Sequence, residues 1–290
     1  MERITELFNT FIDAKELSKN EEAIQKIITT TYAKNQRIKG IKTLLSCTDF
    51  TTLESTDSRE TIWALADKLN NLSDNNPTLP NVASFCTYPK QVATAREVLS
   101  NEEIKLCSVA GGFPSGQTYT EIKIAEAALA ISDGAEEIDM VMNIGDFINE
   151  DYEEVITDIE EVKAACRENT LKVILETGAL NSAEDIAKAS VIAMYSGADF
   201  IKTSTGKIYP GASYESVYTM CLMVRKYYEK HGKRKGIKIA GGLKTVDDAL
   251  NYYKIAEAVL GEEWLTKELF RIGTSKLLKP LAQALETEQG

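Results

Sequence analysis

Histidine is nearly absent from the sequence, the cysteines form no C-x-x-C pair, and no run of about 20 apolar residues occurs. The single histidine, His231, excludes His-rich zinc or iron sites, H-E-x-x-H proteases and serine triads built on a buried histidine. Five dispersed cysteines are typical of reduced intracellular thiols, so we expect a cytoplasmic protein without a disulfide framework and without a bound metal. The missing apolar run excludes a membrane-spanning helix, and the acidic N-terminal segment predicts no secretory signal.

Basic residues are fewer than acidic ones, 33 against 44, and the formal charge at pH 7 is −11. This charge repels the phosphates of nucleic acids and of anionic membranes, so we expect neither as a partner. No G-x-G-x-x-G fingerprint occurs, so a nicotinamide or flavin cofactor is not expected. GGFPSGQT (111–118) has the glycine spacing of a phosphate-binding P-loop, but Gln117 replaces the required lysine, and we interpret this segment as a structured loop.

What the sequence does have is a regular alternation of two kinds of segment. Short apolar or β-branched runs, typical of strands buried on both faces, alternate with segments whose apolar residues are spaced by three and four. One helical segment, 121–134, places Ile122, Ala125 and Leu129 on one apolar face, and another begins with the cap residue Ser182. The eight strand-like runs begin at Thr43, Asn81, Lys105, Glu137, Leu171, Phe200, Gly236 and Phe270.

The spacing of these runs predicts the architecture. A repeat of about 25 to 35 residues matches a βα unit, and a (β/α)8 barrel needs about 250 residues. The sequence therefore predicts a (β/α)8 TIM barrel as the catalytic domain over 43–290, preceded by an N-terminal helical extension over 1–42. A doubly wound open sheet is the alternative, but it usually has fewer strands, and no Pro/Gly linker divides this chain.

Two lysines interrupt consecutive predicted strands, Lys202 in FIKTST and Lys238 in GIKIAGG. Burying an ammonium without a partner is costly, and both would point into the barrel, near the strand ends where such barrels carry their chemistry. Two ammonium groups about 6 Å apart, at an effective dielectric of about 20, repel by roughly 3 kcal/mol, which favours a neutral amine. Such an amine attacks carbonyl carbons, and Asp139 in EIDMVMN is placed to move protons. The alternative is a Lys–Asp–Lys cluster that only holds the barrel together, although buried ion clusters are weak stabilisers.

Six segments carry a family resemblance, in order along the chain: CTDFTTLE, FCTYP, EEIDMVMN, FIKTSTG, IKIAGGLKT and RIGTSKL. They closely resemble the corresponding segments of the deoxyribose-phosphate aldolases, from about Leu44 to Leu278. The resemblance implies a class I aldolase without a cofactor, which cleaves 2-deoxy-D-ribose 5-phosphate reversibly to D-glyceraldehyde 3-phosphate and acetaldehyde through a lysine Schiff base. It implies that Lys202 forms the imine, that Lys238 is its cationic neighbour and that Asp139 donates and accepts protons.

Glycine-containing turns follow the last three predicted strands. Backbone amides exposed after strands seven and eight, ahead of helix starts, are where barrels bind phosphate. The resemblance adds positions that line the pocket near the sugar, and it implies a homodimer that acts on a small sugar phosphate and on acetaldehyde. After Ser275 the family usually has a second serine, whereas this chain has Lys276. The predicted substrate-binding residues are Asp49, Thr51, Cys86, Thr205, Gly206, Lys207, Gly241, Gly242, Lys244, Gly273 and Ser275.

Two other functions stay open. The chain could be another class I aldolase or a transaldolase on a sugar phosphate, or a barrel that binds a sugar phosphate without turning it over. Borohydride trapping with different aldehyde and ketone donors separates the aldolases, and binding without turnover identifies the third class. A metal-dependent aldolase is a poor alternative, because one histidine cannot furnish the usual ligand set.

Overall fold

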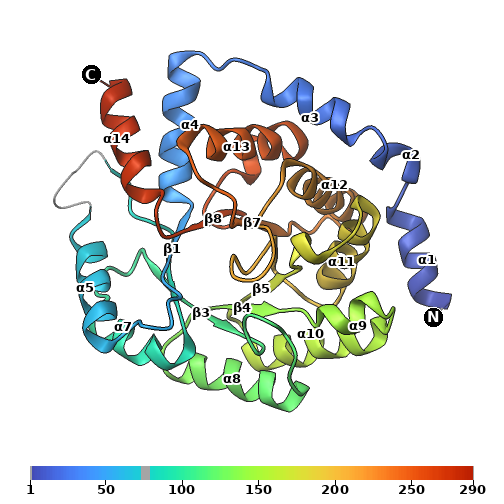
Figure 1. The fold of residues 1–290 in the computed structure, drawn as a ribbon, viewed down its shortest axis with the longest axis horizontal. Helices are drawn as coiled ribbons and strands as arrows, with labels where there is room; N and C mark the ends of the chain where they lie inside the picture. Colours follow the sequence, from blue (N-terminus) through green and yellow to red (C-terminus); the bar gives the residue numbers. More distant parts are fainter. Residues whose placement is uncertain (1, 73–78, 290) are drawn as a thin grey trace.

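Eight parallel strands close into a barrel in the order of the chain, and helices surround it (Figure 1). The computed structural model describes residues 2–72 and 79–289, so residues 1 and 290, the outer limits of the two predicted segments, lie outside it. The predicted (β/α)8 TIM barrel is confirmed. The strands are β1 (Thr48–Thr51), β2 (Ser84–Thr87), β3 (Lys105–Ala110), β4 (Glu137–Val141), β5 (Thr170–Ile174), β6 (Phe200–Lys202), β7 (Gly236–Ala240) and β8 (Phe270–Thr274).

The helices that follow the strands bury apolar faces against the barrel. They are α5 (Arg59–Asn70), α7 (Val92–Val98), α8 (Thr120–Ser132), α9 (Ile144–Ile148), α10 (Tyr152–Cys166), α11 (Ala183–Tyr195), α12 (Tyr214–His231), α13 (Val246–Leu260) and α14 (Leu278–Gln289), with 3-10 turns η1 (Pro89–Gln91), η2 (Thr177–Ala179) and η3 (Glu262–Trp264). At the start of α11, the predicted cap is present: the Ser182 hydroxyl accepts a hydrogen bond from the Asp185 N–H at 3.1 Å. No helix in the described part of the chain has both the length and the apolar character that crossing a bilayer requires.

The buried face of α8 differs from the prediction. Ile122 and Leu129, expected to be buried, are 54% and 65% exposed, whereas Lys123 is fully buried. Lys123 forms an ion pair with Asp158 of α10, and Asp158 also accepts a hydrogen bond from Thr120. A buried ammonium group needs a partner of opposite charge. Helix α8 therefore faces α10 with Lys123, and its larger apolar side chains, Ile122 and Leu129, are exposed to solvent.

Residues 2–46 form four helices on the outside of the barrel: α1 (Glu2–Phe11), α2 (Ala14–Leu17), α3 (Asn20–Ile28) and α4 (Lys34–Ser46). The first three run along α11, α12 and α13, and α4 packs against α13 and α14 (Figure 1). The strand predicted from Thr43 is wrong at its start, because residues 43–46 are the last turn of α4 and β1 begins at Thr48. Leu44 and Leu45 are buried as helical residues, so the limit predicted at residue 42 lies inside α4.

The end of α1 is held on the barrel by one aromatic side chain. Phe11 is buried, contacts the Tyr195 ring edge-on with centroids 5.6 Å apart, and stacks on His231 at 6.4 Å. Lys226 of α12 donates a hydrogen bond to the Phe11 carbonyl at 2.8 Å. The extension is therefore packed onto the barrel through apolar and hydrogen-bonding contacts.

Candidate active site

The interior of the barrel holds a connected network of seven charged side chains, each at most 4% exposed. Four are cationic and three are anionic, so the network has a formal charge of +1 when every group is ionised. Each of them contacts at least one group of opposite sign, as the cost of burying a charge demands. The seven are Asp49 (β1), Glu137 and Asp139 (β4), Lys172 (β5), Lys202 (β6), Lys238 (β7) and Arg271 (β8).

The register of neighbouring strands brings these side chains together. Lys202 and Lys238 are register partners on β6 and β7, and Lys238 and Arg271 are partners on β7 and β8. On the other side, Asp139 of β4 is the partner of Lys172 of β5. Because side chains in equivalent register positions point to the same face of a sheet, all five enter the barrel.

Asp139 lies at the centre of this network. Its Oδ2 atom is 2.7 Å from Lys202 Nζ and 2.7 Å from Lys238 Nζ, so these two nitrogens are at most about 5.4 Å apart. Its Oδ1 atom is 2.9 Å from Lys172 Nζ. Burial alone would raise the pKa of the Asp139 carboxyl, but the three ammonium groups hold that pKa well below its usual value. Asp139 is therefore an ionised carboxylate shared by three lysines.

The two predicted active-site lysines have different surroundings. Lys238 Nζ contacts Asp49 at 2.5 Å as well as Asp139, and these carboxylates raise the pKa of Lys238 although burial alone would lower it. Lys202 Nζ has Asp139 as its carboxylate partner, and its side chain is the one of the two that lines the pocket above the network. Lys238 is thus held as a cation between two carboxylates, while Lys202 faces the pocket.

Three members of the network, Glu137, Lys172 and Arg271, were not predicted from the sequence. Lys172 Nζ lies 2.6 Å from Glu137 Oε2, and Arg271 donates hydrogen bonds to Asp49 at 2.6 Å and to Glu137 at 2.7 Å. The pattern that indicates Lys202, a cationic residue inside an apolar run, also occurs at Lys172 in LKVILET and at Arg271 in FRIGTS. With them, the site is a cluster of three carboxylates and four cations, not a lysine pair with one aspartate.

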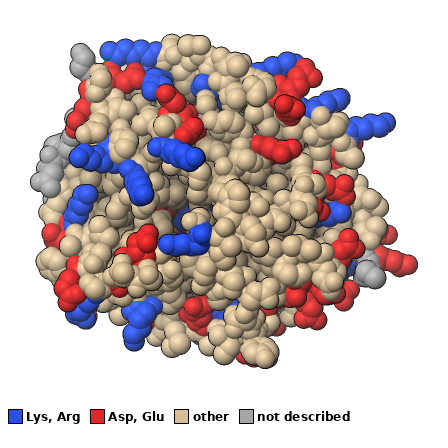
Figure 2. All heavy atoms as spheres, viewed as in Figure 1, with Lys and Arg blue, Asp and Glu red and all other residues tan. Residues whose placement is uncertain are grey.

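A pocket of about 210 Å³ opens above the network at the carboxyl ends of the strands. On the face shown in Figure 2, Lys and Arg side chains gather around a hollow over the middle of the barrel. Of the predicted residues, Asp49 and Cys86 are buried below the pocket, and Gly242 and Lys244 are not part of its lining. The predicted residues that line it are Lys202, Thr51, Thr205, Gly206, Lys207, Gly241, Gly273 and Ser275, and Lys276 lines it as well.

The turn after β7 depends on glycine. Gly241 has φ +70, and a Cβ atom there would lie 2.9 Å from Gly211 Cα of the loop after β6. Only glycine adopts this backbone conformation without strain and leaves room for the second loop. The close approach of the two loops forms one wall of the pocket, with Gly206 on the same side.

Glu176, just after β5, has its side chain turned into the protein and not toward solvent. It is buried, its backbone has φ +51, and its carboxylate accepts hydrogen bonds from the Thr205 N–H at 3.2 Å and the Thr205 hydroxyl at 2.5 Å. Burial raises the pKa of Glu176, although both hydrogen bonds favour the carboxylate. Glu176 therefore fixes the loop that carries Thr205 and Gly206 into the pocket.

One set of three potential metal ligands occurs in the described part of the chain. The Sγ atoms of Cys86 and Cys107 and a carboxylate oxygen of Asp139 lie within 4.8 Å of one another. Both Asp139 oxygens are already in contact with ammonium groups, so a cation bound there would meet three positive charges. This donor set does not suit a divalent metal while the lysines are protonated.

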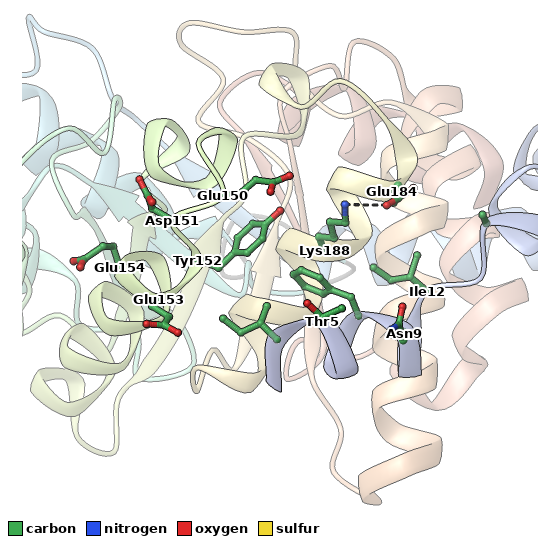
Figure 3. A pocket seen from close by; sticks show the side chains of 13 residues that line it. Thr5, Asn9, Ile12, Glu150, Asp151, Tyr152, Glu153, Glu154, Glu184 and Lys188 are labelled. Carbon is green, nitrogen blue, oxygen red and sulfur yellow. Dashed lines mark ion pairs between the residues drawn. The ribbon is translucent and has the colours of Figure 1, made fainter. Parts of the chain in front are cut away.

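A second cavity, of about 620 Å³, lies between α1 and the helices α10 and α11 (Figure 3). Phe8 and Tyr152 line it together with several carboxylates, and its lysine, Lys188, is paired with Glu184 at 2.8 Å. It holds no buried lysine to attack a carbonyl carbon. The chemistry predicted from the sequence therefore belongs to the smaller pocket over the barrel.

Comparisons with known proteins agree with this geometry. The model of the DeoC/LacD family aldolases matches residues 47–278. The human deoxyribose-phosphate aldolase is 37% identical over 250 residues, which cover 82% of this chain and 78% of the human protein. A Caenorhabditis elegans protein that carries the same name provisionally is 40% identical over 256 residues, covering 87% of this chain and 84% of its own.

A solved structure shows the same fold. The deoxyribose phosphate aldolase from Aeropyrum pernix, described as a tetramer, superposes with a TM-score of 0.68 at 22% identity, over 94% of this chain and 98% of that one. The family match begins just before β1 and ends after β8, so it includes every residue of the charge network. Because the family model matches most of the chain and the human relative is 37% identical over 82% of it, the chain belongs to the DeoC/LacD family of aldolases.

Proposed function

We propose that this chain is a deoxyribose-phosphate aldolase, which cleaves 2-deoxy-D-ribose 5-phosphate reversibly to D-glyceraldehyde 3-phosphate and acetaldehyde through an imine on Lys202. The observation that carries the proposal is Asp139 Oδ2, which lies 2.7 Å from both Lys202 Nζ and Lys238 Nζ. A carboxylate that contacts the reacting amine and a permanent cation can move protons at each stage of imine formation.

Lys202 is the lysine best placed to serve as the neutral amine. The network has one cation in excess, so loss of one proton leaves three charges of each sign. Lys238 contacts two carboxylates, and Lys172 contacts Asp139 and Glu137 with Asp49 at 3.8 Å. Losing a proton breaks the fewest ion pairs at Lys202, which is also the lysine that reaches the pocket.

The chemistry follows from a neutral amine next to a carboxylate. The Lys202 nitrogen attacks the aldehyde carbon of the open-chain sugar, and loss of water from the carbinolamine gives an iminium ion. The C3 hydroxyl then loses its proton, the C2–C3 bond breaks, and its electron pair forms an enamine as D-glyceraldehyde 3-phosphate leaves. A proton added at C2 and hydrolysis of the imine release acetaldehyde and restore the lysine. We assign the proton transfers to Asp139, with Lys238 holding the positive charge beside it.

The rim of the pocket supports a phosphorylated substrate. Gly206 and Gly241 both have positive φ, and together with Gly273 they line the pocket at the carboxyl ends of the last strands. Lys207 and Lys276 add positive charge at the same rim. Backbone amides and lysines at this end of a barrel form the usual binding site for a phosphate group.

Reductive trapping tests the imine assignment. Borohydride added in the presence of acetaldehyde should attach one ethyl group to the peptide that contains Lys202, and Lys202→Met should remain unlabelled. Dihydroxyacetone phosphate in place of acetaldehyde should give no adduct, and labelling by that donor would favour a different class I aldolase. Labelling at Lys238 would overturn the assignment, and binding of the sugar phosphate without any trapped imine would support a non-catalytic barrel.

We also propose that the enzyme is a metal-independent homodimer of the cytoplasm. The single histidine and the dispersed thiols support the first and last of these statements, and the family resemblance alone supports the dimer. Light scattering should give the mass of two chains, and exhaustive chelation should leave the cleavage rate unchanged. Activity that is lost on chelation and restored by zinc, or a native mass of one or four chains, would contradict these statements.

A further inference from the structure

Two cysteine side chains meet beside the charge network. Cys86 and Cys107 are register partners on the parallel strands β2 and β3, so both side chains enter the barrel. Neighbouring strands lie about 4.8 Å apart, inside the range of about 4.4 to 6.8 Å between Cα atoms that a disulfide spans. The two sulfurs lie within 4.8 Å of each other. We propose that Cys86 and Cys107 form a reversible disulfide when the protein meets a hydroperoxide, and that this disulfide lowers the activity at Lys202.

The two thiols have different pKa shifts, and this difference decides which of them reacts with the peroxide first. The neighbouring Cys107 thiol, and then the ammonium charges of Lys238 and Lys202, lower the pKa of Cys86 although it is buried. Burial and the neighbouring Asp139 raise the pKa of Cys107 well above its usual value. Cys86 therefore supplies the thiolate that reacts first, and Cys107 is the thiol that resolves the product.

The reaction balances with a hydroperoxide as oxidant. The Cys86 sulfur attacks the peroxide, the O–O bond breaks, and the product is a sulfenic acid with water as the leaving group when hydrogen peroxide is used. The Cys107 sulfur then attacks the sulfenic sulfur, the S–O bond breaks, and a second water leaves as the S–S bond forms. The two thiols lose two electrons and two protons, and these are taken up by the peroxide.

The disulfide would disturb the carboxylate that the aldolase reaction uses. The Cys107 thiol donates a hydrogen bond to Asp139 Oδ1 at 3.2 Å, and Lys172 Nζ lies 3.4 Å from the same sulfur. A disulfide removes the S–H donor and draws the sulfur toward Cys86, because an S–S bond is about 2.0 Å long. Asp139 then loses one of the contacts that hold it between the lysines. The loss of activity rests on the proposed aldolase function, whereas the disulfide itself does not.

The remaining cysteines are poor competitors. All five cysteines are buried, but only the pKa of Cys86 is lowered, whereas burial raises the pKa of Cys47 to about 12 and that of Cys166 to about 11. Burial raises the pKa of Cys221 as well. Thiols with a raised pKa carry little thiolate at neutral pH and react slowly with peroxides.

Intact mass after treatment of the reduced full-length chain with hydrogen peroxide tests the proposal. The wild type should lose about 2 Da, the mass of two hydrogens, and peptide mapping should join the Cys86 and Cys107 peptides. Cys107→Ala should show oxygen addition at Cys86 instead of this loss, and Cys221→Ala, a matched control on α12, should behave as the wild type. Aldolase activity of the wild type should fall about tenfold or more and return after dithiothreitol.

Each readout can overturn a separate part of the proposal. Oxygen addition to Cys86 in the wild type without loss of two hydrogens, or a disulfide that joins other cysteines, would refute the pairing. A quantitative Cys86–Cys107 disulfide with full activity would refute the effect on Lys202. Absence of activity before any peroxide is added would instead count against the aldolase function, and the mass readout would still decide the pairing.

Discussion

Lys238 is a buried cation that shares Asp139 Oδ2 with Lys202. Without it, the network contains three cations and three carboxylates, so a protonated Lys202 becomes the balanced state. An interaction of roughly 3 kcal/mol between the two ammonium groups corresponds to about 100-fold less neutral amine. We expect Lys238→Met to lower kcat/KM by about that factor at pH 7 and to regain part of its rate as the pH rises.

The comparison for this variant is Lys202→Met, which lacks the proposed nucleophile and should not recover at any pH. Single-turnover trapping with acetaldehyde and borohydride across pH 6 to 10 separates imine formation from later steps. Trapping by Lys238→Met at the wild-type rate at pH 7 would show that Lys238 has no influence on the amine.

Glu176 acts through another residue, because its carboxylate holds Thr205 of the pocket rim and does not line the pocket itself. Loss of these hydrogen bonds should free the loop and weaken substrate binding by roughly 1.5 kcal/mol, which is about tenfold. Glu176→Ala should therefore raise KM for the sugar phosphate about tenfold and leave kcat within about twofold. Glu176→Gln keeps an acceptor for the Thr205 N–H and should restore most of the affinity. Equal loss of kcat in both variants would place Glu176 in the chemical steps.

Among the elements, helix α8 packs against α10 through the buried ion pair between Lys123 and Asp158, although its sequence contains an apolar stripe. Removing one partner of such a pair leaves an uncompensated charge, so Lys123→Met should lower the free energy of unfolding by about 3–5 kcal/mol. The double variant Lys123→Met/Asp158→Leu replaces the pair with apolar contacts and should recover most of this loss. Urea unfolding measures both. Equal instability of the single and double variants would show that the pair is needed for more than charge compensation.

The elements also show how far the sequence determines the site. Strand positions follow from buried apolar runs, and the alternation of strand side chains is enough to place Lys202, Lys238 and Asp139 in one interior. The run from Thr43 fits a helix as well as a strand, and packing of Leu44 and Leu45 against the core decides for α4. The positions of loop residues cannot be predicted from the strand pattern. The position of Gly241, for example, depends on its close contact with Gly211, which lies in a different loop.

At the scale of the whole molecule, the charge network links the first strand of the barrel to the last two strands. Asp49 stands on the first strand, and its carboxylate contacts Lys238 of β7 and Arg271 of β8 at 2.5 and 2.6 Å. These ion pairs join the beginning of the barrel sequence to its end, across the strand pair β1 and β8 that completes the ring. The charges that we propose to prepare Lys202 for catalysis therefore also join the ends of the barrel sequence, and we expect both effects to depend on pH.

Acid should weaken the fold through Asp49 in a way that can be isolated. Burial alone would raise the pKa of Asp49, but Arg271, Lys238 and Lys172 lower it below its usual value. A carboxyl group with a lowered pKa in the folded state adds stability above its unfolded pKa of about 3.9, and this stability is lost as the pH falls below that value. One such group contributes a slope of up to about 1.4 kcal/mol per pH unit.

We expect Asp49→Asn to be less stable than the wild type at pH 7, because three cations lose a carboxylate partner. We also expect it to lose stability less steeply below pH 4, by about 1 kcal/mol per pH unit. Urea unfolding at pH 7, 4, 3.5 and 3 measures this slope. Asp247→Asn, at an acid whose side chain is 74% exposed, is the control for the removal of one carboxylate outside the barrel. Equal slopes for Asp49→Asn and the wild type would mean that Asp49 binds protons alike in the folded and unfolded chain, and the ion pairs at the barrel closure would then contribute nothing to its resistance to acid.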